Sequence, residues 1–88
     1  PEAYTLHQNY PNPFNPSTNI KFDIPKDSDV KIAVYDMLGR EVQVLAYEYN
    51  SAGSYELSFD ASSLSSGIYF YRLTAGSFTD VKKMVLIK

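Results

Sequence analysis

Few residues in this 88-residue chain could do chemistry, and no catalytic set can be assembled from them. A serine nucleophile needs a neighbouring base, but the only histidine, His7, precedes a proline-rich segment and has no companion motif. The ten carboxylates could supply an acid pair of the glycosidase kind, yet most of them stand at turns or on the polar phase of expected strands, as solvated side chains do. The sequence therefore predicts that the chain is not an enzyme.

Metal and cofactor sites have equally little support. Asp27, Ser28 and Asp29 resemble the opening of a calcium loop, but the glycine and the distal glutamate of an EF-hand are missing. Turn chemistry explains both aspartates more simply, although a structural calcium at this point is left open. There is no cysteine, and the four glycines stand far apart, which excludes a thiolate site and a glycine-rich phosphate loop. We expect no cofactor and no metal.

Tyrosine is the one residue type that favours a binding hypothesis. The chain has eight tyrosines, and aromatic rings exposed together on a sheet can stack against sugar rings. The candidates for such a platform on one sheet are Tyr47, Tyr49, Tyr55, Tyr69 and Tyr71. Tyrosine is also an ordinary filler of small β cores and sheet faces. Packing is the favoured interpretation, and the sugar platform is its alternative.

Size and charge exclude several classes of function. The formal net charge is −2 and the lysines and arginines are scattered, which argues against a nucleic-acid partner. No apolar run approaches the ~20 residues that cross a bilayer, so no membrane insertion is expected. The opening residues Pro1 to Tyr4 do not resemble a signal peptide. If the protein is exported, its entry signal is expected on a longer parent chain.

Apolar residues recur with a period of two along most of the chain, which is typical of β-strands. No stretch of a dozen residues keeps helical spacing. The segments that alternate in this way or are continuously apolar are 4–8, 20–24, 30–35, 42–49, 55–59, 68–73 and 78–88. Turns at nearly regular spacing separate them. The predicted fold is an all-β, immunoglobulin-like antiparallel β-sandwich of about seven strands.

Local patterns add four expectations to this outline. The apolar phase changes between Val44 and Leu45, which predicts a bulge or a crossing between sheets. Gly39 is expected to supply a positive φ at its turn. Segment 68–73 is apolar on both faces, as in a central strand. A short helical turn is expected within residues 60–67.

The segment between the first two expected strands, residues 9–17, holds three of the five prolines. Proline has no N–H to donate, so the segment is predicted to be a loop outside the sheets. Each Asn-Pro step biases the asparagine towards an extended backbone while its side chain can bond back to the main chain. Phe14 lies between two such steps, and we expect its ring to point inward as a plug.

Three segments occur in the order of one family's signature motifs. They are LHQNYPNPFNPST at 6–18, VYDMLGREV at 34–42, and LSSGIYFYRL at 64–73 followed by KKMVLIK at 82–88. Over nearly its whole length the chain resembles the type A C-terminal sorting domains of the bacterial type IX secretion system. The positions that carry the motifs are Pro11, Asn12, Pro13, Phe14, Asn15, Tyr35, Asp36, Gly39, Arg40, Gly67, Tyr69, Leu73 and Gly76.

The resemblance implies that residues 1–88 are a single sorting domain at the end of a longer secreted protein of a Bacteroidota-like bacterium. Such domains direct a fused N-terminal cargo from the periplasm across the outer membrane, to the cell surface or the medium. The implied partners are the outer-membrane machinery of type IX secretion and a sortase-like processing peptidase. No catalytic, cofactor or metal residue is implied.

The last expected strand is the natural place for recognition, because the backbone groups of an edge strand can pair with a receptor strand. The candidate recognition residues there are Lys82, Lys83, Met84, Leu86 and Lys88. The lysines have an equally supported alternative interpretation, since edge lysines also prevent indiscriminate pairing of strands. Phe14, Asn12 and Asn15 are expected to hold the fold before they contact any receptor.

Two other functions remain open. One is a carbohydrate-binding or cell-surface attachment module of a secreted hydrolase, which would expose coplanar aromatic rings. The other is a passive spacer, which would work at any place in a chain. The sequence ends at Lys88, just after the last motif, and this favours a terminal signal over a spacer.

Overall fold

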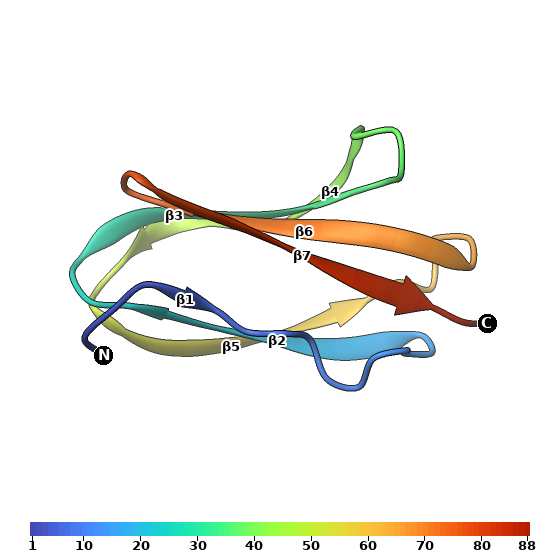
Figure 1. The fold of residues 1–88 in the computed structure, drawn as a ribbon, viewed down its shortest axis with the longest axis horizontal. Coiled ribbons are helices and arrows are strands. Elements are labelled where there is room, and N and C mark those ends of the chain that lie inside the picture. Colours follow the sequence, from blue (N-terminus) through green and yellow to red (C-terminus); the bar gives the residue numbers. More distant parts are fainter.

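The computed structural model describes all 88 residues, Pro1 to Lys88, and contains seven β-strands. The strands are β1 (Thr5–Leu6), β2 (Ser17–Ile24), β3 (Ser28–Tyr35), β4 (Glu41–Asn50), β5 (Gly53–Asp60), β6 (Gly67–Ala75) and β7 (Phe78–Leu86). They form two antiparallel sheets, in the orders β1-β2-β5 and β4-β3-β6-β7. Figure 1 shows the sheets as two layers, with the chain termini at opposite ends. The predicted seven-stranded antiparallel β-sandwich is confirmed.

Side-chain alternation along the strands places a hydrophobic core between the two sheets. In β2, for example, Ile20, Phe22 and Ile24 are buried while the residues between them are exposed or half-buried. Phe14 joins this core from the proline-rich loop, where it is 2% exposed and its ring centroid lies 6.1 Å from that of Phe59. The prediction that Phe14 acts as an inward plug is confirmed.

The structure also confirms the predicted strand irregularities and positions. Ile32 and Ala33 of β3 pair with Ala46 and Val44 of β4, so that Leu45 is an extra residue and forms a bulge. Strand β6 lies between β3 and β7, which makes it central as expected. Strands β4 and β7 are consequently the two edges of the four-stranded sheet.

Turn geometry agrees with the sequence at one expected position and differs at another. Gly39 has a φ of 81°, in the left-handed region that glycine enters without a steric penalty. The expected helical turn between β5 and β6 is not formed. Instead, the Asp60 carboxylate accepts a hydrogen bond from the Ser62 N–H at 2.9 Å, and the Leu64 N–H donates to the Ala61 carbonyl at 3.0 Å. A short aspartate side chain that bonds to the backbone two residues on favours such a turn over a helix.

No helix of the structure is long and apolar enough to span a membrane. The first strand is also shorter than predicted, because only Thr5 and Leu6 pair with β2. Beyond it, the His7 N–H still donates to the Lys21 carbonyl, and Tyr10 forms an isolated antiparallel bridge with Asn19 of β2. The rest of the proline-rich loop then leaves this sheet.

Candidate functional site

Strand β7 is an edge strand whose two halves have different surroundings. It pairs with β6 on one side, and its other side faces away from the sheet. We call residues 78–83 the open half and residues 84–86 the covered half. The difference between them comes from the proline-rich loop, residues 9–16, which lies against the covered half only.

The loop bonds directly to the free side of the covered half. The Phe14 N–H donates to the Val85 carbonyl and the Ile87 N–H donates to the Phe14 carbonyl, both at 3.0 Å. Phe14 and Leu86 thereby form a parallel bridge. In addition, the Val85 N–H donates to Oδ1 of Asn12 at 3.0 Å. These bonds occupy the backbone groups that a receptor strand would need, so the covered half cannot accept one while the loop is in place.

The open half keeps backbone groups directed away from β6. Because outward and inward groups alternate along an antiparallel strand, the outward position of Val85 makes Thr79, Val81 and Lys83 outward as well. At the C-terminal end of the open half, Nε2 of Gln8 donates to the Lys83 carbonyl at 2.7 Å. In the middle of the open half, the Val81 N–H donates to Oδ1 of neighbouring Asp80 at 2.8 Å. Strand β1 packs beside β7, and the Tyr4 ring stacks on Phe78 with centroids 5.1 Å apart. The remaining outward backbone groups have no backbone partner and form the unpaired part of the edge.

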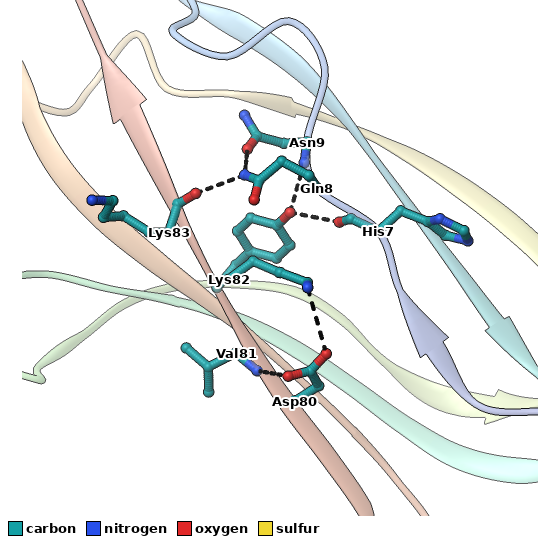
Figure 2. Close-up of polar contacts among 8 residues, drawn as sticks. His7, Gln8, Asn9, Asp80, Val81, Lys82 and Lys83 are labelled. Carbon is teal, nitrogen blue, oxygen red and sulfur yellow. Dashed lines mark hydrogen bonds and ion pairs between the residues drawn. The ribbon is translucent and has the colours of Figure 1, made fainter.

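The candidate recognition residues divide between surface and core. Lys83 is exposed on the outer face of the sheet, and Lys82 is half-buried on the other side with its Nζ 4.0 Å from Oδ2 of Asp80. Figure 2 shows the two lysines leaving the strand on opposite sides. Met84 and Leu86 are 0% and 1% exposed, so their side chains offer no contact to a receptor of the folded domain.

Lys88 is exposed beyond the end of β7. Its Nζ donates to the Ser62 carbonyl at 2.6 Å and its backbone N–H to Oγ of Ser66 at 3.0 Å. The terminal lysine is therefore held against the segment that joins β5 to β6.

A buried polar cluster that the sequence did not indicate anchors the loop. The Asn9 N–H donates to Oη of Tyr71 at 2.7 Å, and this hydroxyl donates to the His7 carbonyl at 2.6 Å (Figure 2). Burial raises the pKa of the Tyr71 phenol to about 12, and the hydrogen bond from Asn9 opposes that rise. Asn9 is 2% exposed and Tyr71 is 0% exposed. The cluster ties the loop to central strand β6.

The Asn9 side chain continues the cluster into the loop itself. Its Nδ2 donates to the Pro11 carbonyl at 3.1 Å and to Oγ1 of Thr18 at 3.0 Å, while Oδ1 accepts from Nε2 of Gln8 at 2.7 Å. The Thr18 hydroxyl also donates to the Pro11 carbonyl, at 2.8 Å. Because buried polar groups are costly unless they are bonded, this set of bonds fixes one conformation of the loop.

The motif at residues 34–42 contains a turn, Asp36–Arg40, whose hydrogen bonds are all formed within the turn. Oδ1 of Asp36 accepts from the Leu38 N–H at 2.9 Å and from the Arg40 N–H at 3.0 Å, while Oδ2 accepts from Nε of Arg40 at 2.7 Å. The Arg40 N–H, followed by the Arg40 guanidinium and the Leu38 N–H, holds the Asp36 pKa below its ordinary value. With the positive φ of Gly39, the turn needs no partner from the rest of the domain.

Most of the remaining motif residues serve packing and turns. Tyr35 stacks under the Arg72 guanidinium, whose carbon lies 4.6 Å from the ring centroid. Leu73 is in the core, and Oη of Tyr69 donates to the Ser65 carbonyl at 2.7 Å. Gly76 has a φ of 58° in the turn before β7. The other motif positions, which are exposed, are Pro11, Pro13, Asn15 and Gly67.

The predicted alternative of five tyrosines on one sheet is wrong. Tyr69 and Tyr71 are buried in the core, and Tyr55 belongs to the other sheet, where it stacks on Phe22 at 5.3 Å. Only Tyr47 and Tyr49 of β4 remain exposed together, at 80% and 65%. Periodicity indicates which face a residue occupies along its own strand, but it does not assign that strand to a sheet.

The one histidine forms a surface ion pair with the wrong geometry for nucleophilic catalysis. Nε2 of His7 lies 3.0 Å from Oδ2 of Asp23. Hydrogen bonds from His7 and then Ser54 hold the Asp23 pKa below its ordinary value. The His7 side chain bonds to the Asp23 carboxylate and to no serine, whereas activation of a serine requires its hydroxyl to bond to the imidazole. No group of three histidine, cysteine, aspartate or glutamate side chains is arranged to hold a metal ion.

Comparison with known proteins assigns the chain to a family. The sequence model of the family described as "Secretion system C-terminal sorting domain" matches residues 8–88. This match covers the proline-rich loop, the Asp36–Arg40 turn and β7. No curated protein and no solved structure matches the chain significantly. The chain belongs to this family of type IX secretion sorting domains.

Proposed function

We propose that this member of the sorting-domain family is a non-catalytic, folded signal that directs a fused cargo across the outer membrane by type IX secretion, to the cell surface or the medium. The family match over residues 8–88 carries the proposal. The sandwich with its own core supports a signal that is recognised as a folded unit. The cargo would be fused before Pro1 and would cross the periplasm with the domain attached.

The open half of β7 is the proposed recognition element. A receptor strand in the outer-membrane machinery would pair with its outward backbone groups, and Lys83 on the outer face would select the partner by charge. Lys82, on the other side of the strand, and Lys88, beyond its end, would contribute to the same selection. A sortase-like peptidase would then separate the cargo from the domain. This arrangement is supported by the outward groups at Thr79 and Val81, which have no backbone partner.

Export of a fluorescent reporter tests the function. The 88 residues would be fused to the C-terminus of the reporter, behind a periplasmic signal, in a type IX-competent bacterium and in a mutant that lacks the pore. We expect the reporter in the medium or on the surface of the first strain only. Periplasmic retention of the intact, folded fusion in both strains would refute the proposed function.

A proline substitution tests the recognition edge. The Val81 N–H points away from β6, so Val81→Pro blocks strand addition while the β6–β7 ladder keeps its bonds. We expect Val81→Pro to abolish export and Val81→Thr to preserve it, provided that both variants remain folded. Normal export of folded Val81→Pro would show that strand addition at this edge is not used.

The charges need a separate comparison. Lys82→Gln with Lys83→Gln is expected to lower export. Lys21→Gln in β2 with Lys26→Gln in the turn between β2 and β3, both away from β7, is expected to leave export unchanged. Equal export by the two double variants would mean that Lys82 and Lys83 only prevent indiscriminate strand pairing.

Carbohydrate binding is the second candidate function, and one observation favours it. The exposed ring of Tyr47 borders a shallow hollow of about 310 Å³ that is also lined by Asp29, Lys31 and Thr74. An aromatic ring beside polar groups suits a sugar. Titration with soluble polysaccharides should then show binding that Tyr47→Ala removes and Tyr10→Ala, at an equally exposed tyrosine, preserves. No binding by the unmodified domain would eliminate this candidate.

A further inference from the structure

The tip of the Asp36–Arg40 turn carries two large apolar side chains in solvent. Met37 is 64% exposed and Leu38 is 78% exposed. The exposed residues of the other turns are small or polar, namely Lys26-Asp27, Ser51-Ala52, Gly76-Ser77, and Ser62-Ser63 and Ser65-Ser66 on either side of half-buried Leu64. The proline-rich loop exposes one large ring, Tyr10 at 80%. The Asp36–Arg40 turn differs from all of them because it exposes two neighbouring large apolar side chains.

The fold does not require these two side chains. Three hydrogen bonds to the Asp36 carboxylate close the turn, and they come from the Leu38 N–H and from the backbone and side chain of Arg40. Gly39 supplies the positive φ. Any side chain other than proline at position 38, and a wide range of side chains at position 37, would leave these bonds in place. The apolar character of the tip is therefore explained by neither core packing nor turn geometry.

The surface beside the tip is hollowed and partly apolar. Met37 lines one hollow of about 260 Å³ together with Tyr35, Phe70, Arg72 and Val81, which lie on the outer face of the four-stranded sheet. It also lines a second hollow of about 230 Å³, which extends past Leu38 towards Ile68 and Gly67. A projecting side chain between two hollows can interlock with a partner surface of complementary shape.

The position of the tip would also let it contact a partner while a cargo is fused to the N-terminus. Figure 1 shows the turn before β4 at the same end of the sandwich as the C-terminus, and the N-terminus at the opposite end. A cargo that precedes Pro1 would thus leave the tip free.

We propose that Met37 and Leu38 form an apolar anchor that inserts into an apolar pocket of the receptor protein, with a receptor carboxylate meeting Arg72 at the rim. This deepens the proposed sorting function and rests on it. A protein partner is favoured over a lipid surface by charge. Asp36 and Arg40 neutralise each other at 2.7 Å, and the tip has no cluster of cations of the kind that anionic membranes attract.

The test compares two pairs of large side chains with similar exposure. Met37→Ser with Leu38→Ser removes the anchor. Tyr10→Thr with Tyr49→Thr removes two exposed tyrosines, one on the proline-rich loop and one on β4, which are 80% and 65% exposed. Met37→Leu keeps the tip apolar. All variants should melt within about 3 °C of the unmodified domain, because exposed substitutions away from caps and cores have small effects.

Two measurements are made on the reporter fusions. The first is export from a type IX-competent bacterium. The second is co-sedimentation with outer-membrane fragments of that bacterium and with protein-free vesicles of its extracted lipids. We expect the Met37/Leu38 variant to bind the membrane fragments about tenfold more weakly, as loss of a buried apolar anchor does. Its export should fall, while Met37→Leu and the tyrosine variant behave normally.

Unchanged binding to membrane fragments by the Met37/Leu38 variant would overturn the inference. Binding to the protein-free vesicles that depends on the tip would overturn it too, in favour of a lipid partner. These failures differ from failure of the sorting function, in which the unmodified fusion itself would not be exported. In that case the binding measurement still decides whether the tip contacts a membrane protein.

Discussion

The proline-rich loop and the Asp36–Arg40 turn lie at the same end of the sandwich (Figure 1), but the loop buries side chains whereas the turn exposes them. The loop sends Asn9 and Phe14 inward, each 2% exposed, and bonds to β6 and β7. The turn bonds only to itself and sends Met37 and Leu38 outward. Two motifs of one family therefore have different roles. The loop holds the domain together, whereas the turn presents side chains.

Removing the Phe14 ring is the strongest test of this difference. Phe14→Ala should lower the free energy of unfolding by ~3–5 kcal/mol, because it leaves a cavity beside Phe59 in the core. For a domain this small, such a loss approaches the total stability. Urea denaturation followed by tyrosine fluorescence measures it. A loss below ~1 kcal/mol would mean that the loop does not anchor the fold, and Asn15→Ala, at an exposed loop position, is the matched control.

The buried cluster gives the next largest effect and a pH signature. Tyr71→Phe leaves the Asn9 N–H and the His7 carbonyl without their partner, which should cost ~1–3 kcal/mol. The folded-state pKa of Tyr71, about 12, lies above the ordinary value near 10. Its contribution to stability is therefore complete below about pH 10 and is lost as the pH rises through about 12.

Alkaline denaturation of the unmodified domain and of Tyr71→Phe checks whether the Tyr71 contribution to stability is lost as the pH rises. The free energy of unfolding of the unmodified domain should fall between about pH 10 and 12, and Tyr71→Phe should show a shallower fall. Parallel pH profiles for the two proteins would contradict a buried, neutral Tyr71 hydroxyl.

The sequence predicted what depends on local pattern. Alternation located the strands, and the change of phase between Val44 and Leu45 located the bulge. The two Asn-Pro steps around Phe14 indicated its inward ring. The same alternation indicates that Met84 and Leu86 are buried, because they share one face of β7 with Lys82, whereas Lys83 has the other face.

What the sequence could not predict depends on contacts between distant residues. Asn9 and Tyr71 are 62 positions apart, and nothing local indicates that this asparagine is buried. Likewise, the sequence indicated an edge at β7 but not that the loop covers half of it. Pairing of Phe14 with Leu86 depends on how the finished sandwich brings the two ends of the chain together.

In the Asp36–Arg40 turn, substitution of Gly39 should lower the stability of the domain less than the loop substitutions do, and its effect should stay local. Its φ of 81° disfavours a side chain, although an added Cβ would meet nothing within 4 Å. Gly39→Ala should therefore cost only ~1–2 kcal/mol of backbone strain. Amide hydrogen exchange should accelerate at Leu38 and Arg40. The protection of the β6 amides should fall only as far as the loss in the free energy of unfolding of the whole domain predicts. Cooperative loss of the whole sheet would show that the turn is not self-contained.

The smallest predicted effect is a shift in the Asp36 pKa, which distinguishes the contribution of the backbone N–H groups from that of the Asp36–Arg40 ion pair. The Asp36 pKa is below its ordinary value, so the carboxylate stabilises the domain above that value, and its contribution is lost as the pH falls through the lowered pKa. Since the Arg40 N–H is the largest cause of the lowered pKa, Arg40→Gln should raise the Asp36 pKa only part of the way towards its ordinary value.

Leu38→Pro removes the Leu38 N–H, another donor to the Asp36 carboxylate, and should also raise the Asp36 pKa. An NMR titration of the Asp36 carboxyl carbon measures both shifts. A fully normal pKa in Arg40→Gln would mean that the exposed guanidinium, rather than the backbone, shapes the turn, and the tip would then depend on a side chain that solvent and salt can weaken.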